Sequence, residues 1–119
     1  MSAESAGKLF SKMVISLTFD PGLDTKNPAN TDLHQSGTLK PVSLGRSFFN
    51  LSLMDNSLLD EFDLAGIKVD GSVFATGLQQ RAFILLHEFK HAVTGKAHSS
   101  EAEYKDWLQG VYDNCFKPK

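Results

Sequence analysis

Two histidines and a glutamate stand at a spacing that could hold and use a metal ion. His87, Glu88 and His91 form the pattern H-E-x-x-H within the segment 81–98. On a helix, residues four apart differ by about 40° in direction and lie about 6 Å apart along the axis, so both imidazoles can reach one ion. Glu88 lies about 100° round the helix from His87, so its carboxylate can take a proton from a metal-bound water without binding the metal.

The residues around this pattern favour a buried metal helix over an amphipathic helix that carries two histidines by chance. Residues 82–86 are all apolar, and Ala92 and Val93 follow the second histidine. Apolar surroundings strengthen the field of an ion at the water that it binds. Three of the four histidines of the chain also fall within residues 87–98. We therefore expect one zinc ion, Zn2+, on this helix.

The third protein ligand that a catalytic zinc site needs has two candidates. His98 lies shortly after the motif, in the loop that follows the expected helix. Glu101 opens the next expected helix, within about 50° of the centre of its apolar stripe, so it faces inward. A carboxylate at a helix start is also stabilised by the helix dipole. His98 is the preferred third ligand, and Glu101 is the alternative third ligand or a fourth ligand.

Residues 83–93 resemble the active-site helix of the zincin metallopeptidases, whose H-E-x-x-H pattern supplies two zinc ligands and a general base. The resemblance implies that His87 and His91 bind zinc, and that Glu88 activates water and later protonates the leaving amine. With His98 included, the order H-E-x-x-H-x-x-x-G-x-x-H is similar to the metzincin pattern with one residue inserted before the glycine. The Met-turn of metzincins has no counterpart, because no methionine follows the motif.

The same resemblance suggests candidates for the third ligand, for a substrate-binding strand and for a group that stabilises the oxyanion. A gluzincin-like arrangement would take Glu101 from the following helix as the third ligand. The zincin fold has an edge strand above the zinc that pairs with extended substrate, and residues 48–53 are the candidate here. Zincins often use a tyrosine hydroxyl to stabilise the oxyanion. The tyrosines of this chain, Tyr104 and Tyr112, lie on an apolar stripe, which favours a place in the core or at its edge.

Capping signals give the ends of the helix that carries the motif. Thr76 and Gln79 fit a capping box, in which the two side chains satisfy free backbone donors at a helix start. Gly95 suits the left-handed conformation that often ends a helix. We expect the helix to run from about residue 77 to about residue 94. Lys90 sits away from its ligand face and is expected to be solvated.

A second helix is expected to pack beside the first. Ser100 and Glu103 fit another capping box. A single apolar face with the helical period follows, made of Tyr104, Trp107, Leu108, Val111, Tyr112 and Cys115. A connection of about five residues makes the two helices antiparallel or sharply crossed neighbours, and brings the start of the second close to His91. Cys115 is expected to be buried on this face.

The earlier part of the chain predicts strands. Apolar residues alternate at 13–19 and 48–53, as in half-buried strands. Asp70-Gly71 predicts a hairpin across residues 67–74. Pro41 confines residues 40–44 to a sheet edge or a connection.

The remaining segments have weaker patterns. Residues 1–11 are expected to form a frayed, disordered start or a short helix. Residues 20–38 are rich in Asp, Asn, Pro and Gly, which predicts a long surface loop with a solvated His34. A short helical turn is expected from residue 55 to residue 62.

Length and composition predict one domain over residues 1–119. The expected elements are of the α+β class, with a small mixed sheet or hairpins packed on the motif helix, followed by a C-terminal helix, and the resemblance implies that this domain is zincin-like. The chain is 41% apolar and holds nine Phe, enough for one core. A net charge of −2 with scattered Lys and Arg argues against binding to nucleic acid. The single cysteine excludes an internal disulfide. No apolar run could span a membrane and the chain as given has no signal-peptide pattern, so we expect a soluble protein and leave its compartment open.

The expected function is that of a zinc-dependent metallopeptidase, which hydrolyses a peptide or protein substrate with a zinc-bound water and Glu88 as general base. The alternative is a non-catalytic, zinc-stabilised binding module, in which Glu101 closes the site beside His98. The intact Glu88 favours the enzyme, because a closed structural site has no use for a general base.

Overall fold

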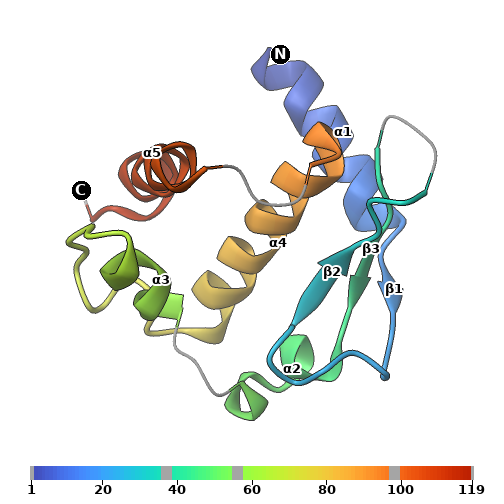
Figure 1. The fold of residues 1–119 in the computed structure, drawn as a ribbon, viewed down its shortest axis with the longest axis horizontal. Helices are drawn as coiled ribbons and strands as arrows, with labels where there is room; N and C mark the ends of the chain where they lie inside the picture. Colours follow the sequence, from blue (N-terminus) through green and yellow to red (C-terminus); the bar gives the residue numbers. More distant parts are fainter. Residues whose placement is uncertain (1, 36–38, 55–57, 97–99, 119) are drawn as a thin grey trace.

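The computed structural model describes residues 2–35, 39–54, 58–96 and 100–118, without the side chain of Glu101. It confirms the α+β class, with helices around a small mixed sheet (Figure 1). The helices are α1 (Ala3–Ile15), α2 (Arg46–Phe49), the 3-10 turn η1 (Leu51–Leu53), α3 (Leu58–Leu64), α4 (Gly77–Thr94), α5 (Glu101–Val111) and the π-helical turn η2 (Tyr112–Phe116). The strands are β1 (Thr18–Phe19), β2 (Ala29–Thr31) and β3 (Val42–Leu44).

Helix α4 runs through the middle of the molecule, with the sheet on one side and α3 and α5 on the other (Figure 1). Its predicted ends are confirmed. At the start, Thr76 Oγ1 accepts from the backbone N–H of Gln79 at 3.2 Å, and Gln79 Oε1 accepts from the N–H of Thr76 at 3.4 Å. At the end, Gly95 has φ 68 and its N–H donates to the carbonyl of His91 at 2.9 Å. A positive φ of this size favours glycine, because a Cβ would crowd the backbone.

The sheet has the strand order β1-β3-β2 in the described part of the chain. Strand β1 is parallel to β3, and β2 is antiparallel to it. The prediction that 40–44 lies at an edge or in a connection is therefore wrong, because Val42–Leu44 is the central strand. Pro41 precedes the strand and contributes only its carbonyl, which accepts from Asp32 N–H at 2.9 Å. Pro41 has no N–H to return the bond to Asp32, so the β2–β3 ladder ends at this pair.

The predicted strand at 13–19 is mostly helix α1, and only Thr18–Phe19 is a strand. Ser2 caps the helix by accepting from the backbone N–H of Ser5 at 3.1 Å. Met13 is buried against α4 and the sheet, whereas Ile15, expected on the same strand face, is 85% exposed. Phe10 and Met13, three residues apart, thus lie on one face of a helix. Of the two predictions for residues 1–11, a disordered start or a short helix, the helix is the one observed.

The predicted strand at 48–53 is also wrong, since these residues form the end of α2 and the 3-10 turn. Arg81 of α4 donates from Nε to the carbonyl of Phe48 at 2.7 Å and from Nη2 to that of Phe49 at 2.9 Å. Asn50 then caps the 3-10 turn, with its Oδ1 accepting from Ser52 N–H at 3.3 Å. A distant guanidinium takes carbonyls that a strand would need for its ladder, which explains the loss of the strand.

The predicted hairpin across 67–74 is a compact turn without strands. Asp70 Oδ1 accepts from the hydroxyl and the N–H of Ser72, at 2.7 and 2.9 Å. These bonds hold the pKa of Asp70 below its usual value. The N–H of Asp70 donates to the hydroxyl of Tyr112 at 3.0 Å, so α5 and its extension fix the turn. Ile67 and Val73 enter the core from either side of the turn instead of pairing across it.

Two clusters of buried side chains lie against α4. The larger is centred on Phe62, Phe83 and Leu108 of α3, α4 and α5, which are all fully buried, and extends to Ala29 and Leu44 of the sheet. The smaller joins α4 to α1 and the sheet through Met13, Val42 and Ala92. None of the helices in the described residues is long and apolar enough to cross a membrane.

The prediction that Cys115 is buried is wrong, because its side chain is exposed. After α5 the chain widens into the π-helical turn, in which Lys117 N–H donates to the carbonyl of Tyr112 at 2.7 Å. In such a turn the bonded residues are five positions apart, instead of four as in an α-helix, so every later side chain is rotated about the helix axis. Phe116 takes the place on the apolar face and packs against Phe74, with ring centres 5.1 Å apart.

Candidate metal centre

His87 and His91 converge on one side of α4, as the spacing predicts. Their Nε2 atoms are 3.0 Å apart and their ring centres 4.9 Å apart. Two zinc ligands at a tetrahedral angle, each about 2.0–2.1 Å from the ion, lie about 3.3 Å from each other. A small movement of either ring would therefore let both nitrogens bind one ion.

The surroundings of His91 fix its proton on the nitrogen that faces away from the pocket. Its Nδ1 lies 2.8 Å from the carbonyl oxygen of Lys96, and this oxygen can only accept a hydrogen bond. Nδ1 therefore carries a proton, and in the neutral ring Nε2 keeps the lone pair that could bind a metal ion. A backbone carbonyl on the far nitrogen is a common support of a metal-binding histidine, since it fixes the tautomer and the ring orientation.

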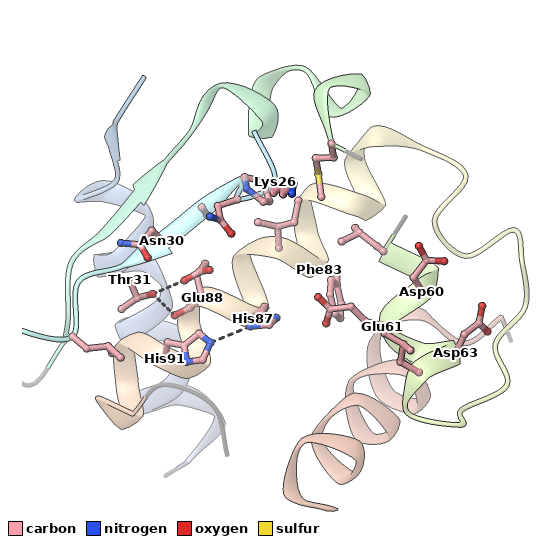
Figure 2. A pocket seen from close by; sticks show the side chains of 18 residues that line it. Lys26, Asn30, Thr31, Asp60, Glu61, Asp63, Phe83, His87, Glu88 and His91 are labelled. Carbon is pink, nitrogen blue, oxygen red and sulfur yellow. Dashed lines mark hydrogen bonds between the residues drawn. The ribbon is translucent and has the colours of Figure 1, made fainter. Parts of the chain in front are cut away.

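Glu88 is held on the opposite side of the pocket from α5. Thr31 of β2 donates from Oγ1 to Glu88 Oε2 at 2.6 Å and lies 3.3 Å from the backbone carbonyl of Glu88 (Figure 2). His87, Glu88 and His91 line one pocket of about 810 Å³. The sequence did not indicate Thr31, because this residue lies in a polar segment without a periodic pattern.

Two aromatic rings of α5 pack beside His87. Tyr104 and Trp107 of α5 each lie with ring centres 5.8 Å from that of His87. The hydroxyl of Tyr104 donates to Glu61 Oε2 of α3. Burial, together with the bond to this carboxylate, raises the pKa of Tyr104 above its usual range, so the phenol keeps its proton. Glu61 also lines the pocket and faces His87 across it, a place that the sequence did not predict (Figure 2).

Lys90 is half-buried, not solvated as expected. Its Nζ lies 5.5 Å from the ring centre of Tyr104 and 5.2 Å from that of Trp107. The two rings are stacked at 10°, and their faces attract the ammonium. Lys90, at the second variable position of the motif, therefore joins α4 to α5 through these two rings.

The third ligand remains a prediction. His98 lies outside the described residues, and Glu101 is described only by its backbone at the start of α5. No group of three or more His, Cys, Asp and Glu residues that could hold an ion occurs within the described ranges. His34 is exposed in its loop, as predicted, and its backbone N–H donates to Asp32 Oδ1 at 3.0 Å.

Comparisons with protein-family models, with curated proteins and with solved structures gave no match to this chain. The interpretation of the site therefore depends on the side chains themselves. The two imidazoles, with converging Nε2 atoms, are ligands of a kind that zinc accepts, and the Glu88 carboxylate is anchored apart from them.

Proposed function

We propose that the chain is a zinc-dependent metallopeptidase. The observation that carries the proposal is the placing of His87, Glu88 and His91 in one pocket. The imidazoles face each other through Nε2, while the carboxylate between them in sequence is turned toward β2. A metal site with a general base needs this separation, because the base must reach water without binding the ion.

Each residue has a distinct role in the proposed reaction. His87 and His91 bind zinc through Nε2, and His98 or Glu101 completes the ligand set. Zinc, when bound, supplies a Lewis acid that acidifies water and polarises the scissile carbonyl. The Glu88 carboxylate accepts a proton from the attacking water and passes it to the leaving amine, whose C–N bond breaks.

Strand β2 replaces residues 48–53 as the candidate for binding an extended peptide. It is an outer strand of the sheet, and residues 27–31 line the pocket. Asp32 N–H and the Pro28 carbonyl are bonded toward β3. Backbone groups alternate in direction along a strand, so those of Ala29 and Thr31 point to the other side. A substrate strand could pair there and lie across the pocket.

The test compares the parent protein with Glu88→Gln, using casein and a random-peptide library as substrates. We expect about one equivalent of zinc in both proteins. We expect hydrolysis by the parent only, since loss of a general base costs about 10²–10⁴-fold in rate. Glu103→Gln, at an exposed site on α5, is the matched control and keeps parent activity. Full hydrolysis by the Glu88→Gln protein, or no zinc in the parent, contradicts the proposal.

The same experiment distinguishes the alternative function. A parent protein that holds zinc and cleaves nothing in the library supports a zinc-stabilised binding module. His98→Ala and Glu101→Ala, measured separately for zinc content, then identify the remaining ligands. Large zinc loss in only one variant indicates three protein ligands, and loss in both indicates a closed site of four.

A further inference from the structure

The hydrogen bond between Thr31 and Glu88 joins two elements that are far apart in the sequence. The Thr31 hydroxyl has one proton, and its oxygen is 2.6 Å from Glu88 Oε2 but 3.3 Å from the Glu88 carbonyl. The shorter contact therefore takes the proton. Thr31 is 9% exposed, so little water competes for this bond. A hydrogen bond to a carboxylate is also stronger than one between neutral groups.

A glutamate side chain on a helix can otherwise take many orientations. Its three torsions cost conformational entropy when they are fixed, and a base that is misplaced by about 1 Å loses much of its effect. Thr31 is buried and paired with Val42 of β3, so it provides a rigid anchor on β2. We propose that Thr31 is a positioning residue, whose hydroxyl holds the Glu88 carboxylate in the orientation that accepts the proton from water.

Thr31 also has a place on the proposed substrate strand. Its side chain faces Glu88, while its backbone N–H and carbonyl point to the outer side of β2. One residue therefore links peptide binding to the orientation of the base. This inference rests on the proposed peptidase function and adds a residue to it. Loss of the hydroxyl alone should affect turnover, because the backbone groups that would bind substrate are unchanged.

The kinetic test uses Thr31→Val, which keeps the branched shape but removes the donor, and Thr31→Ser, which keeps the donor. We expect Thr31→Val to lower kcat about tenfold or more, with KM and zinc content unchanged, since a hydrogen bond to a charged group is lost. Thr31→Ser should keep most of the turnover. The control is Thr18→Val on β1, where the hydroxyl bonds Ser43 Oγ at 3.0 Å instead. Unchanged kcat in Thr31→Val overturns the inference.

A second measurement does not depend on activity. Urea midpoints are compared for the parent, Thr31→Val, Glu88→Ala and the double variant. We expect Thr31→Val to lower the midpoint of the parent, but to have a much smaller effect in the Glu88→Ala background. Additive shifts show that the bond contributes nothing and overturn the inference, even in an active enzyme. A zinc-loaded parent that cleaves no peptide overturns the proposed function instead and removes the positioning role of Thr31 in the reaction, whatever the midpoints show.

Discussion

Lys90 occupies a variable position of the motif, yet its side chain is half-buried. The Lys90 side chain extends over the stacked rings of Tyr104 and Trp107. These rings also flank His87, so the ammonium, the rings and the histidine form one layer between α4 and α5. Lys90 thus connects α4 to the two rings of α5 that flank His87.

Replacing Lys90 by Met should therefore lower the free energy of unfolding by about 0.5–1 kcal/mol, because the alkyl packing stays and the cation–π attraction is lost. Lys90→Arg should keep most of the stability, since a guanidinium also stacks on rings. Urea unfolding measures both changes. Lys117→Met, at an exposed lysine after the last turn, is the control and should have little effect. Equal losses in the two Met variants would show that the ring contact is not stabilising.

Helices α4 and α5 could be predicted from the sequence because their signals are local, whereas parts of α1 and α2 are predicted as strands. Capping residues and a terminal glycine fix the ends of α4, and Ser100 caps α5 as expected. The strands depend on distant partners, and so they could not be predicted. Arg81 takes the carbonyls of Phe48 and Phe49. In the site, the pair of histidines follows from helix geometry, whereas Thr31 and Glu61 come from other elements through tertiary packing.

Gly95, at the end of α4, and Gly110, inside α5, should change stability in opposite directions when each is replaced by alanine. Gly95 has φ 68, so Gly95→Ala should lower the free energy of unfolding by about 1 kcal/mol. Gly110 lies inside α5, and an added Cβ meets nothing within 4 Å. Gly110→Ala should therefore raise the free energy of unfolding by about 0.5–1 kcal/mol. Urea unfolding of both variants tests this, and shifts of the same sign would contradict the assigned helix ends.

Across the whole molecule, α4 contributes to both clusters of buried side chains. Thr31 and the smaller cluster attach it to the sheet. The larger cluster attaches it to α3 and α5, and also reaches Ala29 and Leu44 of the sheet. The proposed ligands His87 and His91 lie on α4 itself. Both candidates for the third ligand belong to the connection with α5 or to its first residue. A zinc ion bound by this set would cross-link α4 to the chain that leads into α5.

Zinc should therefore stabilise the folded protein as a whole, and chelation should reverse the effect. A ligand that binds only the folded state, at a free concentration 100 times its Kd, adds about 2.7 kcal/mol, or about 10 °C in Tm for a domain of this size. Thermal unfolding with zinc and then with EDTA measures this shift. His91→Ala should abolish it, whereas His34→Ala, in an exposed loop, should preserve it. An equal zinc shift in His91→Ala would mean that the ion binds elsewhere, because a two-histidine site on α4 cannot keep its affinity after losing one imidazole.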